Sequence, residues 1–188
     1  MTLGIKVGPD KQSFLDVAQT NAPFTEVWFN IARADEYTEL FGELKRRKMQ
    51  VGLHFWGVLK DSISTGFGYP DQSILKASAD LVKKTIDIAA ANKFQYVNIH
   101  PGNRAIVKMD LDRMDYPYVS NPIPLPQAQA IFLDQVTKLN QHAKDRGVVL
   151  TVETVSRLIP KTDWYNPESR LKPLDIYQLP VASIQAAG

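Results

Sequence analysis

The chain has 188 residues, of which 44% are hydrophobic and 22% charged, and its formal net charge at pH 7 is +2. This composition is typical of a globular protein with a hydrophobic core, and the small net charge does not by itself predict nucleic-acid binding. The absence of cysteine excludes disulfides and thiolate metal sites. No apolar run approaches the ~20 residues that span a membrane, and the N-terminus has no signal-peptide pattern, so we expect a cytoplasmic protein.

Five short stretches rich in apolar and β-branched residues predict strands, because such residues are favoured in sheets. Glycine, proline or polar residues bound most of these stretches, as expected where a strand gives way to a turn. The predicted strands are Leu3–Val7, Glu26–Ile31, Gln50–His54, Tyr96–Ile99 and Val148–Glu153.

Four helices are predicted between these strands from apolar residues spaced three or four positions apart. Ser13 is expected to cap the first helix and Asp35 the second. The third runs from about Gln72 to Ala91, and the fourth closes at the glycine stop Arg146-Gly147. The residues expected to face inward are Phe14, Val17 and Ala18; Tyr37, Leu40, Phe41 and Leu44; Leu75, Ala79, Val82, Ile86 and Ala89; and Ala128, Phe132, Val136, Leu139 and Ala143.

Three other stretches do not fit this pattern of strands and helices. The connection of residues 102–126 holds four prolines and is long enough to suggest a lid or a disordered segment. Residues 45–48 are all basic and end the second helix, where cations favour the helix dipole, so they do not require a nucleic-acid partner. Beyond Glu153 the sequence is polar and rich in proline, and no sixth strand is predicted.

Strands that alternate with helices predict a parallel sheet, either open and doubly wound or closed into a (β/α)₈ barrel. No Gly-x-Gly-x-x-Gly follows the first strand, so the dinucleotide-binding version of the open sheet is not supported. Residues of metal-ligand types, His54, His100 and Glu153, end three successive strands, which favours a barrel because all its strand ends face one pocket.

A complete barrel takes about 250 residues. We therefore expect residues 1–188 to form one α/β domain, a truncated (β/α)₈ barrel with about five parallel strands and four to five helices. An unclosed barrel has two strand edges and is expected to expose apolar interior side chains. This predicts poor solubility or a homodimer.

Three strand ends resemble the xylose isomerase-like barrel superfamily, which holds sugar isomerases, sugar epimerases and apurinic endonucleases. They are Gly52-Leu53-His54, Asn98-Ile99-His100-Pro101-Gly102 and Thr151-Val152-Glu153. The resemblance implies that the two histidines and the glutamate bind a divalent metal such as Zn²⁺, Mn²⁺ or Mg²⁺. It also implies a metal-dependent sugar or sugar-phosphate isomerase or epimerase with a small carbohydrate substrate. Further Asp, His and Glu ligands of such families come from strands six to eight, which have no counterpart in this sequence.

Two features bear on the subfamily and point in different directions. The endonucleases usually follow the histidine of the third strand with a small residue, proline and tyrosine, whereas this chain has Phe55-Trp56-Gly57. The mononuclear epimerases often lack a histidine on the fourth strand, so His100 points back towards a multi-metal site. An apurinic endonuclease-like phosphodiesterase and a catalytically incomplete fragment stay open as alternatives, and so does enzymatic activity itself.

Glu153 is predicted to hold the metal and to take the proton next to a carbonyl that the metal polarises. The alternative is a strand-end glutamate paired with a lysine. For His100 the alternative is a hydrogen bond to the loop that follows it. For His54 the alternative is a place in an aromatic substrate wall with Phe55 and Trp56.

Three further residues are predicted to contact the substrate: Trp56, Asn98 and Arg157. Trp56 can stack on a sugar or simply pack against its neighbours, and Arg157 lies in a basic stretch that can bind a phosphate or remain solvated. Lys6 and Asn30 end the first two strands and could reach the same pocket. The third histidine, His142, is predicted to lie on a solvated helix surface.

Overall fold

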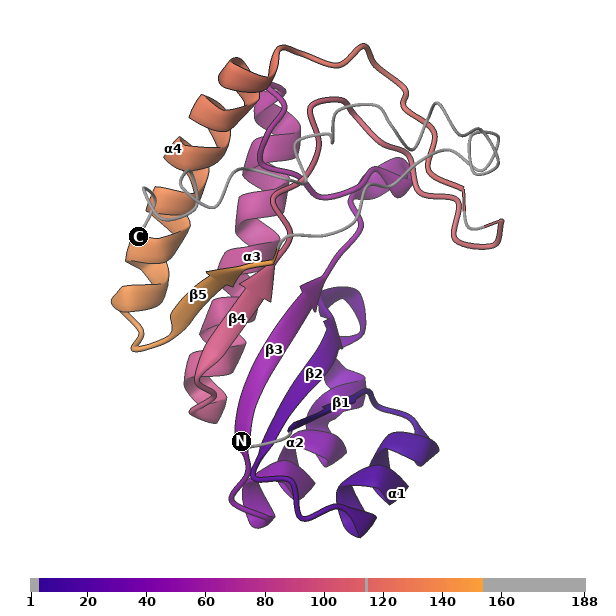
Figure 1. The fold of residues 1–188 in the computed structure, drawn as a ribbon, viewed down its shortest axis with the longest axis vertical. Helices are drawn as coiled ribbons and strands as arrows, with labels where there is room; N and C mark the ends of the chain where they lie inside the picture. The colour runs from indigo at the N-terminus through magenta and orange to yellow at the C-terminus, as the bar shows by residue number, and fades with distance from the viewer. Residues whose placement is uncertain (1–3, 114, 154–188) are drawn as a thin grey trace. The chain divides into compact units, whose positions relative to one another are not determined.

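Five strands alternate with helices along the chain in the computed structural model, which describes residues 4–113 and 115–153 (Figure 1). The strands are β1 (Gly4–Val7), β2 (Phe24–Asn30), β3 (Gln50–Trp56), β4 (Tyr96–Ile99) and β5 (Val149–Val152). The α-helices are α1 (Lys11–Gln19), α2 (Thr38–Arg46), α3 (Gln72–Asn92) and α4 (Leu125–Lys144), and two 3₁₀ helices are η1 (Ile31–Tyr37) and η2 (Lys60–Ser62).

The strands form one parallel sheet in the order β1-β2-β3-β4-β5. Each strand therefore lies beside the next one along the chain, as in a (β/α)₈ barrel. An open doubly wound sheet reverses its strand order at a switch point, and the described strands contain no such reversal. The predicted fold class, part of a (β/α)₈ barrel, is confirmed.

The described chain divides into two compact units. The first comprises residues 4–56, 81–99 and 140–151, and it contains α1, α2 and nearly all of the sheet. The second comprises residues 57–80, 100–139 without residue 114, and 152–153. In this second unit an isolated β-bridge between Ile63 and Lys108 ties the long connection after β4 to the segment after β3, and one between Val107 and Tyr118 lies within that connection.

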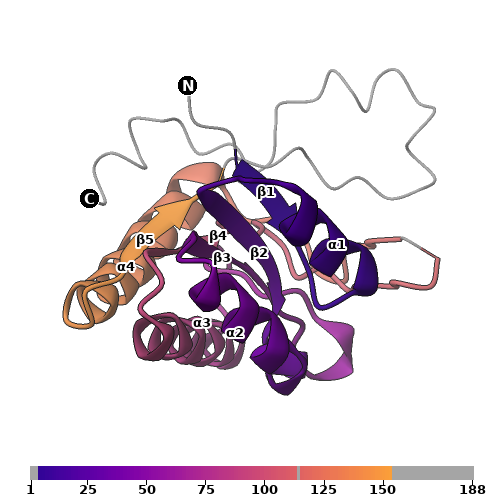
Figure 2. The ribbon, with the colours of Figure 1, turned by 90° about the horizontal axis from the view of Figure 1, so that it is seen from below.

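The core of the first unit lies between the sheet and its helices, and Figure 2 shows α1 and α2 on the same side of the strands. Phe29 of β2 contacts Tyr37 and Phe41 at centroid separations of 4.9 and 5.9 Å, and Phe94 packs edge-on against Phe41. The four residues predicted to face inward from residues 37–44 are all buried. The five predicted for α4 are buried as well.

Four helix predictions were wrong in detail. Ala18, expected to face inward from α1, is exposed. Asp10, not Ser13, caps α1, since its Oδ1 accepts from the Ser13 amide at 2.9 Å. Asp35 lies inside η1, because a 3₁₀ helix precedes α2 and replaces a side-chain cap. In α3 the buried residue is Ser78 and not Ala79, because the Ser78 hydroxyl accepts a hydrogen bond from the Gly66 amide.

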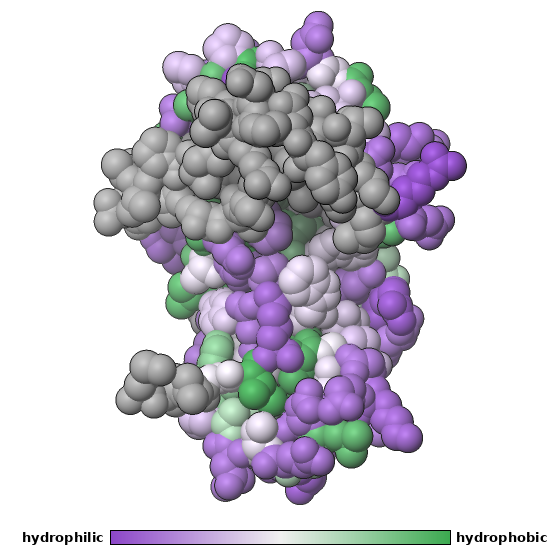
Figure 3. Space-filling view, turned by 45° about the vertical axis from the view of Figure 1, so that its right-hand side comes forward, coloured by the Kyte–Doolittle hydropathy of each residue, from purple (hydrophilic) through white to green (hydrophobic). Residues whose placement is uncertain are grey.

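The sheet face that points away from α1 and α2 carries both polar and aromatic side chains, and the aromatic ones include Trp28 and Trp56. Its side chains include Lys6, Glu26, His54 and Asn98, which alternate with core residues along their strands. On the molecular face drawn in Figure 3, hydrophilic residues surround smaller groups of hydrophobic ones. None of the helices that the structure describes is long and apolar enough to cross a bilayer.

Candidate functional site

Four residues share one level of the sheet on successive strands: Lys6, Glu26, Gly52 and Tyr96. Glu26 collects the polar contacts at this level. Lys6 Nζ lies 3.0 Å from its Oε1, and the Tyr96 hydroxyl donates to its Oε2 at 2.8 Å. Burial raises the pKa of Glu26, but the hydrogen bonds from Tyr96 and Lys6, with the nearby charges of His54 and Lys6, outweigh burial and lower it below the usual value. The carboxylate is therefore held ionised within the sheet.

Trp28, His54 and Asn98 form the next level towards the carboxyl ends of the strands. His54 is 1% exposed, and its ring stacks on the Trp28 indole with the centroids 4.7 Å apart. Its Nδ1 lies 3.1 Å from Glu26 Oε1, 3.1 Å from Lys6 Nζ and 3.4 Å from Asn98 Nδ2. Packing and polar contacts together fix the plane and the direction of this imidazole.

The contacts at Nδ1 bear on which tautomer His54 adopts. With a proton on Nδ1, this nitrogen donates to the ionised Glu26; without it, Nδ1 accepts from Lys6 or Asn98, whose nitrogens are both donors. Metal-binding histidines are commonly oriented by a carboxylate in this way. The tautomer that donates to Glu26 suits coordination through Nε2, which is compatible with the predicted role of His54 as a metal ligand.

Asn98 links β3 to β5 through side chains. It is 7% exposed, its amide nitrogen lies near His54, and its Oδ1 accepts from Thr151 Oγ1 at 3.0 Å. Asn98 was predicted to contact substrate, and the structure places it in this buried chain from His54 to Thr151. The three side chains consequently lie on the same face of the sheet.

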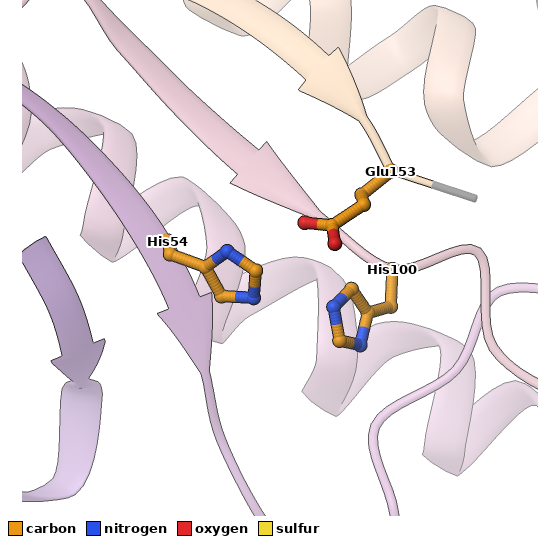
Figure 4. A group of neighbouring side chains, drawn as sticks. All are labelled: His54, His100 and Glu153. Carbon is orange, nitrogen blue, oxygen red and sulfur yellow. The ribbon is translucent and has the colours of Figure 1, made fainter. Parts of the chain in front are cut away.

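His100 and Glu153 come two residues after Asn98 and Thr151, directly past the ends of β4 and β5 (Figure 4). Because side chains alternate along an extended chain, positions two residues apart favour the same face. Both residues are half-buried, and a ligand nitrogen of His100 lies within 4.8 Å of a carboxylate oxygen of Glu153. An imidazole and a carboxylate this close are suitable donors for a divalent cation.

The turn after His100 is shaped by Gly102. Its φ of +87° is unfavourable for other residues, and an added Cβ would lie 2.4 Å from the Cα of Gly66. The Phe67 amide donates to the carbonyl of Pro101 at 3.3 Å, which holds the turn against residues 66–67. The His-Pro-Gly motif therefore has a structural explanation in addition to its histidine.

A pocket of about 600 Å³ opens in the first unit beside Trp28. Its wall contains Trp56, which the sequence predicted to contact substrate, and also Lys6, the last residue but one of β1, and Asn30, which ends β2. The other lining residues are 7–10, Ser13, Trp28, Arg33 and Tyr37. The volume lies in the range of small-molecule sites.

Sequence reasoning missed Glu26, Trp28 and Arg33. The signal available for the first two was alternation within β2, which places Glu26, Trp28 and Asn30 on one face. His142 was predicted to be a solvated residue, but it is half-buried and its Nε2 lies 3.1 Å from Asp87 Oδ1. Arg157, predicted to bind substrate, lies outside the described residues.

Solved structures of sugar epimerases and a xylose isomerase domain protein have the same fold as this chain. A D-tagatose 3-epimerase-like protein matches with a TM-score of 0.59 and 13% identity, over 84% of this chain and 55% of that one. D-psicose 3-epimerase from Clostridium cellulolyticum H10 matches with a TM-score of 0.58 and 12% identity, over 84% of this chain and 54% of that one. A xylose isomerase domain protein from Planctomyces limnophilus matches with a TM-score of 0.53 and 15% identity, over 83% of this chain and 55% of that one.

The chain thus spans about half the length of these structures. No protein-family model and no curated protein matches it. At this level of identity the similarity establishes the fold alone, part of a (β/α)₈ barrel as the sequence predicted.

Proposed function

We propose that this chain is part of a metal-dependent sugar isomerase or epimerase, in which His54, His100 and Glu153 hold a divalent cation. The observation that carries the proposal is the buried chain from His54 through Asn98 to Thr151. It aligns β3, β4 and β5 on one face, and His100 and Glu153 follow two residues later on the latter two strands. Two ligands of one Zn²⁺ lie about 3–4 Å apart. The ligand atoms of His100 and Glu153 lie within 4.8 Å of each other, so a small movement of these side chains would let both bind one ion.

A bound divalent cation would polarise a substrate carbonyl. Glu153 is proposed to accept the proton from the carbon next to that carbonyl and to return it, which exchanges this hydrogen with solvent. One carboxylate is enough for exchange, whereas inversion of the carbon needs a second acid–base group on the opposite face. His54 holds its orientation through Glu26 and Trp28 and contributes no proton in this scheme.

Pairing within the basic residues 45–48 favours a carbohydrate over a nucleic acid. Arg46 and Arg47 both donate to Glu43, at 2.7 and 2.6 Å, and Lys45 donates to Asn92 at 2.6 Å. Three of the four cations are thus engaged by partners within the first unit. A phosphate-binding surface for DNA needs cations directed at the duplex.

The test is hydrogen exchange in heavy water. The chain with Mn²⁺ is incubated with D-fructose, D-tagatose or D-allulose, and deuterium incorporation next to the carbonyl is followed by mass spectrometry. We expect incorporation that depends on Mn²⁺ and falls by about 10²–10⁴-fold in Glu153→Gln. Cleavage of a duplex with an abasic site, without any exchange, would instead support the endonuclease alternative and refute this proposal.

A further inference from the structure

The pocket beside Trp28 combines two aromatic walls with two cations. Trp28 is 43% exposed and Trp56 is half-exposed, and both line the cavity. The apolar faces of a sugar ring or chain pack well against indole rings. Trp28 itself stacks on His54, and Lys6 Nζ lies 4.6 Å from the centroid of the Trp28 ring.

The cations of the wall are Lys6 and Arg33, and their carboxylate partners do not line the pocket. Lys6 pairs with Glu26, which lies beside it on β2, and Arg33 pairs with Glu36 along η1. A guanidinium that pairs with one carboxylate through two of its nitrogens still has N–H groups to offer elsewhere. Among the residues that line the pocket, two are cationic, Lys6 and Arg33, and one, Asp10, is acidic.

Asp10 is the one carboxylate among the described lining residues, and its oxygens are engaged in capping α1. Oδ1 accepts from the Ser13 amide at 2.9 Å, and Oδ2 accepts from the Ser13 hydroxyl at 2.7 Å. These hydrogen bonds lower the pKa of Asp10, and the bond from the Ser13 amide has the largest effect. The carboxylate is therefore ionised and interacts with the N-terminus of α1. It offsets the two cations only in part.

Building on the proposed function, we propose that this pocket selects a carbohydrate with an anionic end group, a phosphate or a carboxylate, in preference to a neutral sugar. Arg33 would bind the anion by charge-assisted hydrogen bonds and Lys6 would add a second positive charge, while Trp28 and Trp56 contact the carbon chain. Arg33 is the specificity-determining residue in this proposal.

Tryptophan fluorescence of the full chain tests the proposal, since two of its three tryptophans line the pocket. The probes are D-fructose 6-phosphate, D-glucuronate, D-fructose, and D-fructose with inorganic phosphate at equal ionic strength. We expect at least one anionic sugar to bind about tenfold or more tightly than D-fructose, with or without free phosphate. Comparison of the two anionic sugars identifies the end group.

The variant Arg33→Gln should lose about tenfold in affinity for the anionic sugar and should bind D-fructose as the wild type does. Arg46→Gln is the matched control, because Arg46 also pairs with a glutamate three residues away, is exposed, and lies outside the pocket. Equal affinity for charged and neutral sugars, no binding of either, or an equal loss in both variants would overturn the proposal. Binding needs no turnover, so a failure of hydrogen exchange would be seen separately.

Discussion

The Tyr96 hydroxyl on β4 donates a 2.8 Å hydrogen bond to Glu26 on β2, across the strand that separates them. The bond is possible because Gly52 of β3 lies between the two residues and has no side chain. A Cβ at position 52 would lie 2.0 Å from Cζ of the Tyr96 ring. Gly52 thus allows one side chain to span two strand spacings and to reach the carboxylate that contacts His54.

Gly52→Ala is expected to destabilise the fold by about 1–3 kcal/mol, because the new methyl group must displace the Tyr96 ring from a filled space. Loss of the bond to Glu26 accompanies the displacement. Urea unfolding measures the change in the free energy of unfolding. An unchanged midpoint would mean that the ring moves aside without cost.

Gly42→Ala on α2 is the matched control for the substitution at position 52. Nothing lies within 4 Å of an added Cβ at Gly42, which is exposed in the middle of the helix. Alanine is favoured over glycine in a helix by about 0.5–1 kcal/mol. The same urea experiment should therefore give a higher midpoint, opposite in sign to the result for Gly52.

Tyr96→Phe separates the hydrogen bond from the packing of the ring. Phenylalanine keeps the contacts over Gly52 and with Phe24, whose ring centroid is 6.0 Å away, but removes the donor to Glu26. A hydrogen bond to a charged group contributes about 1.5–3 kcal/mol when buried, and Glu26 is 20% exposed, so we expect the lower end of that range. If Tyr96→Phe lowered the free energy of unfolding as much as Gly52→Ala does, the hydroxyl group of Tyr96, and not the packing of its ring, would account for the stabilisation.

Much of the fold was predictable because local signals agreed with tertiary structure. Tyr96–Ile99 is β4 as predicted, since Pro101 and Gly102 mark its end in the sequence. The five buried residues of α4 follow the helical period without interruption. Ser13 misled the cap assignment because Asp10, three residues earlier, caps the same turn more effectively with both carboxylate oxygens.

The site was less predictable because it depends on register between strands. His54, His100 and Glu153 were identified by their expected positions at strand ends. This was wrong for His54, because β3 continues two residues further, to Trp56. Glu26 had no visible partner, since Tyr96 is 70 residues away and reaches it only across Gly52. The polar side chains of this sheet face were missed for the same reason, because the residues of one level come from distant parts of the chain.

Glu43 should make stability depend on pH in the acidic range. Hydrogen bonds from Arg46 and then Arg47 lower its pKa from 4.5 to about 2. A depressed carboxyl pKa stabilises the fold fully above about pH 4.5, and this contribution is lost as the pH falls towards 2. The difference in unfolding free energy between wild type and Glu43→Gln, measured at several pH values, should shrink over that interval. A difference that stays constant from pH 5 to 2 would contradict the ion pairs.

Imidazole NMR during a Zn²⁺ titration tests most directly whether the proposed metal site exists, because the chain has three histidines and only two of them, His54 and His100, are proposed to bind the metal. His54→Ala, His100→Ala and His142→Ala assign the resonances. We predict that the signals of His54 and His100 shift together at one equivalent of Zn²⁺, that His142 is unaffected, and that Glu153→Gln weakens binding about tenfold or more. If His54 and His100 respond at different Zn²⁺ concentrations, or if neither responds, the three residues do not form one metal site.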